Sequence, residues 1–371
     1  KKLISAYQEF SDAQSLWLDD FALFMAIKET LGGGSWDNWP LELRGRNNAA
    51  LSEYKATHSK IIEKHKIRQF FFFSQWSAVK NYANSIGIQI IGDIPIFISY
   101  DSADAWSHPE LFYLSKSGKP TVVAGVPPDY FSPTGQLWGN PLYRWNVHKQ
   151  QGYAWWLERV GAVLNMVDIV RLDHFRGFAA YWEVPARMPT AEIGRWVKAP
   201  GKSLLAAIQK KFPNLPIIAE DLGLITPDVI ELRDTFHLPG MKIFQFAFAA
   251  TPEDPFLPHN YPQNCVAYTG THDNDTTVGW YESAPESERD LCRRYLASSG
   301  SEIAWDMLRE LWKSPATFTL GTLQDFLSLG TQARMNFPGK PYGNWCWRYQ
   351  ASDIDQVLCE RIREINYLYS R

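Results

Sequence analysis

Residues 168–174 read Asp-Ile-Val-Arg-Leu-Asp-His, and this stretch decides the fold that we expect. It is one of six short, nearly continuous apolar runs after residue 87; the others cover residues 88–98, 216–222, 241–248, 265–268 and 317–320. Such runs are typical of strands buried on both faces of a parallel sheet. Helical segments separate most of them, including one that Thr226 and Pro227 begin, and this alternation predicts βαβ units.

Ionisable residues collect where these apolar runs end. They are Asp93, Arg171 with Asp173, Glu220 with Asp221, and His272 with Asp273. In a (β/α)8 barrel, the carboxyl ends of the strands carry the active site. An open, doubly wound sheet is the competing fold, but no Gly-x-Gly-x-x-Gly motif opens a helix in this chain. We therefore expect an α/β protein of the (β/α)8 type.

The regions on either side of residue 88 differ in pattern. Residues 1–87 follow a helical pattern, in which Ser11 and Gln14 fit a capping box before one helix and glycines at 32–34 end it. A second helical stretch covers residues 48–85. Residues 88–371 would form the catalytic barrel, with an insertion at 99–155 that is rich in Pro, Gly and aromatic residues. Its centre, residues 125–141, cannot be a regular helix and is expected to be a functional loop.

The composition excludes several classes of protein. The 371 residues include 37 basic and 40 acidic side chains, which leaves no basic surface for a nucleic acid or an anionic membrane. No apolar run is long enough for a transmembrane helix. We expect no signal peptide, because the first residues show no apolar h-region. The four cysteines form no Cys-x-x-Cys pair and the histidines no His-x-x-x-His pair. We expect reduced thiols, no metal and no cofactor.

Tryptophan is unusually frequent, with 16 residues in the chain. A large core would explain this number. Proteins that handle glucans also use aromatic side chains, because these stack on the apolar faces of sugar rings. Composition alone leaves both interpretations open.

Three carboxylates, those of Asp173, Glu220 and Asp273, follow different predicted strands. Each alone could be a salt-bridged strand end, but together they suit cleavage of a glycosidic bond, which needs a nucleophile and an acid. Arg171 and Asp173 face the same side of a strand, so the guanidinium would keep the carboxylate ionised. Glu220 follows an apolar run that would raise its pKa, as an acid requires. His272 could donate to a sugar hydroxyl.

Eight motifs carry a resemblance to a known family. They are Ile-Gly-Asp93-Ile-Pro-Ile-Phe, Val-Ala-Gly-Val-Pro-Pro-Asp129-Tyr-Phe-Ser, Trp138-Gly-Asn-Pro-Leu-Tyr, Val-Arg171-Leu-Asp173-His-Phe-Arg-Gly, Ala-Glu220-Asp-Leu-Gly, Leu238-Pro-Gly-Met-Lys-Ile-Phe-Gln-Phe-Ala-Phe, Tyr-Thr-Gly-Thr-His272-Asp273-Asn-Asp and Gly-Asn344-Trp-Cys-Trp-Arg. With them, the chain resembles the 4-α-glucanotransferases called amylomaltases or disproportionating enzymes, relatives of the α-amylase clan. The resemblance extends over nearly the whole chain.

The resemblance implies an activity and a role for each site residue. Such enzymes transfer segments of maltooligosaccharides, starch or glycogen to the 4-hydroxyl of an acceptor by retaining double displacement, without a cofactor. Asp173 would be the nucleophile, Glu220 the acid and base, and Asp273 the stabiliser of the transition state. The remaining residues would contact or support the substrate: Asp93, Arg171, His272 and Asn344, with Tyr130 and Trp138 on the acceptor side. The compartment would be the cytoplasm, or the plastid in a plant.

One feature departs from the family pattern. The six visible strands would be strands 3–8 of the barrel, so the first two are missing, and a separate N-terminal segment could complete it. A barrel open in this way would expose two sheet edges. Two other functions therefore stay open: an amylase-type hydrolase with the same carboxylates, and an inactive glucan-binding protein.

Overall fold

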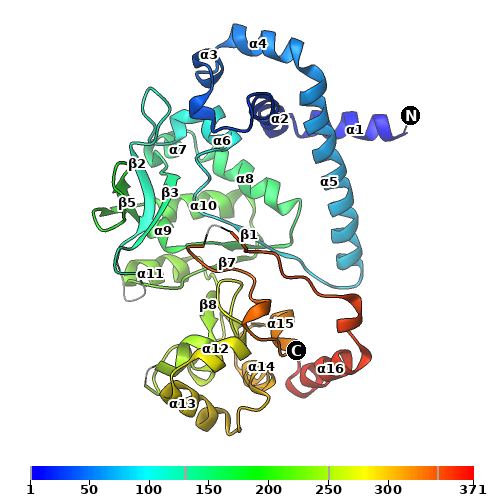
Figure 1. The fold of residues 1–371 in the computed structure, drawn as a ribbon, viewed down its shortest axis with the longest axis vertical. Helices are drawn as coiled ribbons and strands as arrows, with labels where there is room; N and C mark the ends of the chain where they lie inside the picture. Colours follow the sequence, from blue (N-terminus) through cyan, green and yellow to red (C-terminus); the bar gives the residue numbers. More distant parts are fainter. Residues whose placement is uncertain (1, 129–131, 250, 341) are drawn as a thin grey trace. The chain divides into compact units, whose positions relative to one another are not determined.

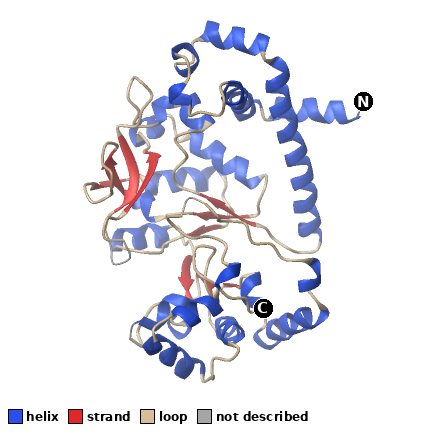
Figure 2. Cartoon of the chain, viewed as in Figure 1, coloured by secondary structure: helices blue, strands red, loops and turns tan. Residues whose placement is uncertain are grey.

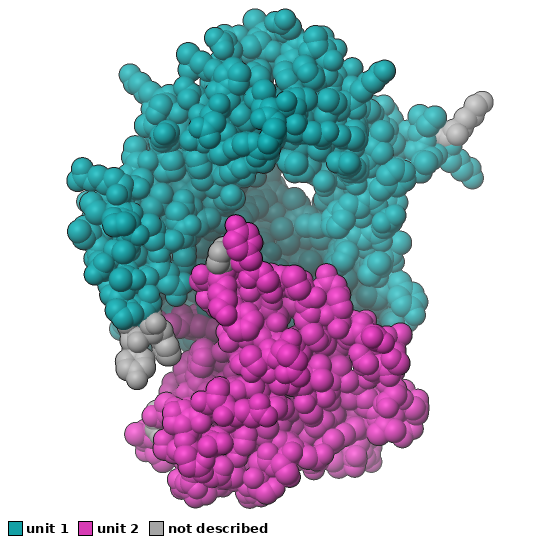
Figure 3. Space-filling view, in the orientation of Figure 1, with its two compact units in different colours: residues 1–220, 225–236 teal, residues 221–224, 237–371 magenta. Residues whose placement is uncertain are grey.

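The computed structural model describes residues 2–128, 132–249, 251–340 and 342–371 (Figure 1). The chain has an α/β fold and divides into two compact units, which Figure 3 colours separately. Unit 1 consists of Lys1–Glu220 and Ile225–Phe236, and unit 2 of Asp221–Leu224 and His237–Arg371. A domain boundary between residues 87 and 88 stays a prediction.

Helices occupy the beginning of unit 1, as the apolar pattern predicts. They are α1 (Lys2–Ala13), α2 (Ser15–Thr30), α3 (Leu41–Arg44), α4 (Asn48–Thr57) and α5 (Ser59–Ser85). α2 buries Leu23 and Ile27, and it ends where Gly32 and Gly33 adopt φ values of 80° and 84°. The expected capping box is wrong, because Ser11 lies inside α1 and the N-cap Gln14 of α2 makes no side-chain capping bond.

Unit 1 contains a parallel sheet of three strands (Figure 2). Its order is β1 (Ile91–Ile94), β4 (Ile169–Leu172) and β7 (Ile217–Ala219), so three of the predicted strands are neighbours. Gly92 allows β1 to approach the connection before β4, because a Cβ atom there would lie 2.3 Å from Cγ1 of Val167. The remaining helices of unit 1 are α6 (Ala103–Ser107), α7 (Trp145–Gln150), α8 (Ala154–Leu164), α9 (Arg176–Ala179), α10 (Gly201–Lys211) and α11 (Pro227–Thr235). Thr226 is the N-cap of α11 and Pro227 its first residue, as predicted.

Unit 1 also contains an antiparallel sheet that the apolar runs did not predict. Its order is β3 (Gln136–Pro141), β2 (Val122–Val126), β5 (Ala180–Pro185) and β6 (Arg195–Lys198). The expected loop over residues 125–141 is therefore in part a β-hairpin, and residues 99–155 hold helices as well as strands. The register of β2 and β3 shifts between Val123 and Gly125, and a Cβ atom on Gly125 would lie 2.5 Å from the carbonyl oxygen of Gln136.

Unit 2 contains the other three predicted strands. β8 (Gly240–Ile243), β9 (Cys265–Tyr268) and β10 (Phe318–Leu320) form a parallel sheet with β9 in the middle. The helices are α12 (Thr277–Ser283), α13 (Glu286–Leu296), α14 (Ile303–Lys313), α15 (Leu323–Phe326) and α16 (Gln356–Tyr369). Phe244, Leu308 and Leu311 are fully buried in the core of this unit.

Short 3-10 helices connect several elements of both units. They cover Trp36–Asn38, Pro109–Leu111, Phe244–Ala249, Pro258–Asn260, Thr331–Ala333 and Ala351–Asp353. Across the part of the chain that the structure describes, every helix is too short or too polar to span a bilayer.

Candidate active site

The carboxyl ends of the parallel strands in unit 1 bring three predicted site residues together. Asp93 lies in β1, Asp173 follows the last residue of β4, and Glu220 follows the last residue of β7. The register pairs Asp93 with Arg171 and Arg171 with Ile218. Because parallel strands end at the same edge of a sheet, the ionisable side chains meet there.

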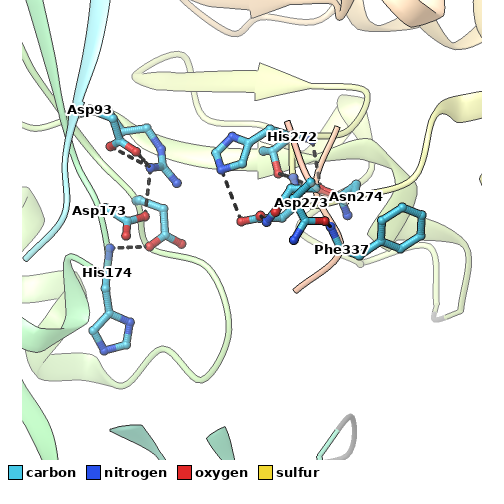
Figure 4. A network of polar contacts seen from close by, with 12 residues as sticks. Asp93, Asp173, His174, His272, Asp273, Asn274 and Phe337 are labelled. Atoms are coloured by element: carbon cyan, nitrogen blue, oxygen red, sulfur yellow. Dashed lines mark hydrogen bonds and ion pairs between the residues drawn. The ribbon is translucent and has the colours of Figure 1, made fainter. Parts of the chain in front are cut away.

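Arg171 binds two carboxylates at this edge (Figure 4). Its Nη1 atom donates to both oxygens of Asp93, at 2.8 Å each, and to Oδ1 of Asp173 at 2.9 Å. The arginine side chain is 11% exposed, whereas that of Asp173 is 39% exposed. Burial alone would lower the pKa of Arg171, but the charges of Asp93 and Asp173 outweigh it and raise that pKa above its usual range. Arg171 is thus a permanent cation beside a carboxylate that solvent can reach.

The turn after β4 contacts Glu220 through its backbone. The N–H of His174 donates to Oε2 of Glu220 at 2.6 Å, as the dashed line from His174 in Figure 4 marks. The N–H of Phe175 donates to the carbonyl oxygen of Glu220 at 3.0 Å, and the N–H of Glu220 donates to Leu172 at 3.0 Å. Main-chain groups therefore fix both the backbone and the carboxylate of Glu220.

The segment after Asp93 is held from α8. Arg159 donates to the carbonyl oxygens of Pro95 at 2.6 Å and Ile96 at 3.3 Å. The hydroxyl of Tyr143, a fully buried side chain, donates to the same Ile96 oxygen at 2.6 Å. These bonds anchor the chain directly beyond the Asp93 position.

The ring of His174 packs against the β2–β3 hairpin. The ring centroids of His174 and Trp138 lie 4.7 Å apart with the rings nearly perpendicular. Trp138 is 38% exposed, and its Nε1 donates to Gln136 at 3.2 Å. Burial, with a smaller effect from the Arg176 charge, lowers the pKa of His174 to about 4. The imidazole is therefore neutral near pH 7.

In unit 2, the loop after β9 carries His272 and Asp273. Nε2 of His272 lies 3.4 Å from Oδ2 of Asp273. Asn336 donates from Nδ2 to Oδ1 of Asp273 at 2.6 Å, and Arg334 donates to the Asp273 carbonyl oxygen at 2.6 Å (Figure 4). The two oxygens of the Asp273 carboxylate are therefore contacted from two segments, by His272 in this loop and by Asn336 further along the chain.

Asn344 stabilises a neighbouring loop of the same unit. Its Oδ1 accepts from the N–H of Phe337 at 2.9 Å, and its Nδ2 donates to the carbonyl oxygen of Lys340 at 2.8 Å. The next residue, Trp345, is 54% exposed and its ring centroid lies 5.1 Å from that of His272. The bonds of Asn344 thus shape the loop that presents Trp345 beside His272.

Comparison with known proteins identifies the family of the chain. The model of the 4-alpha-glucanotransferase family matches residues 1–353 of the chain. The chain belongs to this 4-alpha-glucanotransferase family.

Two relatives of the family are similar over almost the whole chain. The 4-alpha-glucanotransferase of Thermus thermophilus is 51% identical over 366 residues, which are 96% of this chain and 73% of the relative. That of Synechocystis sp. is 48% identical over 98% of this chain and 73% of the relative. Transfer of α-glucan segments is the activity that the family name describes.

A solved family structure has the same fold. The amylomaltase of Streptococcus agalactiae, in complex with acarbose, superimposes with a TM-score of 0.97 at 40% identity. The match covers all of this chain and 75% of that chain. Nothing in these comparisons supports the separate N-terminal segment, which stays a prediction.

For this member of the 4-alpha-glucanotransferase family, the structure groups the predicted residues by unit. Asp93, Arg171, Asp173 and Glu220 share one sheet edge of unit 1, and His272, Asp273 and Asn344 belong to adjoining loops of unit 2. Trp138 lies in β3, and Tyr130 is outside the described residues. The substrate contacts expected of these residues stay predictions.

Sequence reasoning missed three residues of the site. Arg334 and Asn336 are 61 and 63 residues from Asp273, and neither stands in a quoted motif, so no local signal could have found them. His174 did have a signal, because it directly follows Asp173 in the quoted motif. Its contact with Glu220 depends on a backbone conformation that the sequence does not show.

Proposed function

We propose that Asp173, Glu220 and Asp273 carry a retaining double displacement that moves a segment of an α-1,4-glucan to the 4-hydroxyl of another glucan or of glucose. The observation that carries the proposal is the pair of contacts at one sheet edge: Arg171 on Asp173, and the His174 N–H on Glu220. The contact with Arg171 favours the ionised form of Asp173, which a nucleophile requires. The contact with the His174 N–H fixes the orientation of Glu220, which an acid requires. Similarity to 4-alpha-glucanotransferases supports the substrate class.

In the first step, an oxygen of Asp173 attacks the anomeric carbon of the donor glucan. The bond from that carbon to the glycosidic oxygen breaks, and Glu220 gives its proton to the departing oxygen. The product is a glycosyl ester on Asp173 and a free glucan with a new 4-hydroxyl. Arg171 favours the ionised form of Asp173 before the attack, because an adjacent positive charge stabilises a carboxylate.

In the second step, Glu220 acts as a base. It takes the proton of an acceptor 4-hydroxyl, whose oxygen displaces Asp173 from the anomeric carbon. Two inversions give net retention, which requires the two carboxyl groups to lie about 5–5.5 Å apart. Asp273 would stabilise the cationic character of both transition states through its negative charge.

The remaining predicted residues would bind the glucan. Asp93 and His272 offer groups that hydrogen-bond sugar hydroxyls, and the partly exposed Trp138 offers a flat face on the acceptor side. Tyr130 would assist there, and Asn344 would act by shaping its loop. An acceptor site that holds a sugar ring and excludes water would favour transfer over hydrolysis.

We also propose that the two parallel sheets are strands 3–8 of a (β/α)8 barrel. The support is their order, in which each sheet places three consecutive predicted strands side by side. A cytoplasmic location, or a plastid one in a plant, stays a prediction.

The test uses maltotriose alone as substrate. Transfer conserves the number of reducing ends and yields glucose together with products longer than maltotriose. Hydrolysis adds one reducing end for each bond cleaved. We expect longer products without new reducing ends. Glucose and maltose with rising reducing ends would instead indicate an amylase-type hydrolase, and binding without turnover would indicate an inactive glucan-binding protein.

Matched variants test the residue assignments. Asp173→Asn and Glu220→Gln should each lower the transfer rate by at least roughly a hundredfold. The controls are Asp168→Asn, just before the amino end of the same strand β4, and Glu231→Gln on the surface of α11. Both controls should keep the wild-type rate within about threefold, a change of less than 1 kcal/mol. Equal losses in the controls would refute the assignments.

A further inference from the structure

The residue after Asp173 has an unusual backbone. His174 adopts a φ of 48°, which lies in the left-handed region that side chains other than glycine rarely occupy. Such a conformation persists only where its surroundings hold it, and it is enriched at functional sites. Here it falls between Asp173 and the short helix α9.

Three neighbours hold this turn in place. The ring of Trp138 meets the His174 ring edge to face at 4.7 Å, and the ring of Phe97 lies at 6.5 Å. Gly177 allows the close approach, because a Cβ atom there would lie 3.1 Å from Cδ2 of His174. Nε2 of His174 is buried and makes no hydrogen bond within the described residues. The ring thus contributes packing.

The left-handed turn has one direct polar consequence. It points the N–H of His174 at Oε2 of Glu220, at a distance of 2.6 Å. The following N–H, that of Phe175, points at the Glu220 carbonyl oxygen. With the chain on both sides held in place, a change of φ at His174 to the ordinary negative range requires a compensating change of ψ at Asp173. Together, the two changes rotate the peptide between these residues and remove the contact with the carboxylate.

We propose that His174 is a positioning residue, whose left-handed backbone directs its N–H to Oε2 of Glu220 and so orients the carboxyl group that exchanges a proton with the glucan. This inference rests on the proposed function, in which Glu220 is the acid and base. Because Oε2 accepts the N–H, the proton of the acid form belongs on Oε1. In the first step that proton passes from Oε1 to the glycosidic oxygen, and in the second step Oε1 takes the acceptor proton.

The contact also stabilises the product of the first proton transfer. A backbone N–H interacts more strongly with a carboxylate than with a neutral carboxyl group. The His174 N–H therefore helps Glu220 to release its proton without itself gaining or losing one. Trp138 packs on the imidazole, so the backbone conformation of His174 depends on the β2–β3 hairpin.

The test compares substitutions that differ in their tolerance of a positive φ. Gly and Asn adopt the left-handed region readily, whereas the β-branched Val does not. His174→Gly and His174→Asn therefore keep the directed N–H, while His174→Val loses it. Each variant is assayed on maltotriose, whose leaving group needs a proton, and on α-maltosyl fluoride, whose fluoride leaves without one. The readout is the ratio of initial fluoride release to the initial rate on maltotriose.

A ratio of rates does not depend on how much of a variant is folded. We expect His174→Val to raise the ratio roughly tenfold or more, the size of a lost charge-assisted hydrogen bond. His174→Asn and His174→Gly should keep the ratio near that of the wild type. An unchanged ratio in His174→Val, or an equal rise in all three variants, would overturn the proposal.

Glu220→Gln separates this inference from the proposed function. If Glu220 is the acid, this variant raises the same ratio by more than His174→Val does. An unchanged ratio in Glu220→Gln would refute the acid role itself. A raised ratio there with an unchanged ratio in His174→Val would refute only the positioning role of His174.

Discussion

At the scale of single residues, the positive charge of Arg171 keeps the neighbouring Asp173 carboxylate ionised. Its guanidinium binds Asp93 and Asp173 and is itself largely buried. Without it, the carboxylates of Asp93 and Asp173 would lose the cation that both of them bind. The protonated form of Asp173, which cannot attack, would then persist to higher pH.

Arg171→Met should therefore lower the transfer rate on maltotriose by roughly a hundredfold and move the acidic limb of the pH–rate profile to higher pH. Arg171→Lys should show a smaller shift, because it keeps the charge but loses the forked geometry. Rates measured between pH 4 and pH 8 check both variants. An acidic limb that stays at the wild-type pH in Arg171→Met would contradict this role.

The buried His148 leads us to a prediction about how the free energy of unfolding depends on pH. Burial lowers the pKa of His148 to about 4 from its ordinary value of 6.5. The unfolded chain takes up a proton near the ordinary value while the folded chain does not. The contribution of His148 to the free energy of unfolding is therefore complete above pH 6.5, and it is lost as the pH drops toward 4.

His148→Phe should remove this contribution while keeping a ring among Tyr143, Trp145 and Trp155. Between pH 7 and pH 5, the wild type should lose about 2 kcal/mol more unfolding free energy than the variant. Urea denaturation at the two pH values measures the difference. Parallel losses in the two proteins would show that His148 does not titrate as argued.

At the scale of elements, the six parallel strands were predictable because each is a continuous apolar run between helices. The β2–β3 hairpin was not, because its strands enclose Pro and Gly residues that normally mark loops. The pairing of β2 with β5, which lies more than 50 residues after β2 along the chain, carries no local signal. The capping box expected at Ser11 is wrong for a different reason, because α1 continues through that position to Ala13.

Trp138, in strand β3 of the hairpin, is the residue that we expect to affect the ratio of transfer to hydrolysis. Trp138→Ala should weaken the acceptor interaction by about 1–2 kcal/mol, because it removes a partly exposed aromatic face. The ratio of transfer to hydrolysis should then fall more than the rate of the first step. Trp196→Ala is the matched control, since Trp196 is 37% exposed on the edge strand β6 of the same sheet. A lower melting temperature with an unchanged ratio would leave Trp138 a packing residue only.

Asp325 ties three elements of unit 2 together. This carboxylate is 1% exposed and accepts from Oγ1 of Thr269 at 2.6 Å, and from the N–H and Oγ1 of Thr277 at 2.8 and 2.9 Å. It thereby connects α15 with the end of β9 and the first residue of α12.

Asp325→Ala should lower the free energy of unfolding by about 2–4 kcal/mol, because it leaves buried donors without an acceptor. Asp290→Ala, at a half-exposed side chain of α13, should change the free energy of unfolding by no more than about 0.5 kcal/mol. Urea denaturation compares the two. Equal effects would contradict the structural role of Asp325.

At the scale of the whole molecule, sequence patterns located the strand ends and the acidic residues that follow them. They could not locate the contacts that orient these residues. Arg171 bridges two strands, and Asn336 reaches Asp273 across 63 residues. Such contacts join residues that are far apart in the sequence, so they become visible only in the folded chain. The motifs quoted for the family resemblance supplied the chemistry, and the match to the 4-alpha-glucanotransferase family confirms that resemblance.

Direct capture of the covalent intermediate tests the central claim, that Asp173 is the nucleophile. The Glu220→Gln variant is incubated with α-maltosyl fluoride, because the fluoride leaves without an acid and no base then activates an acceptor. Peptide mass spectrometry locates the adduct. We expect one maltosyl group on the peptide that contains Asp173, and none on the Asp173→Asn, Glu220→Gln double variant. An adduct on another residue, or the same adduct in the double variant, would contradict it.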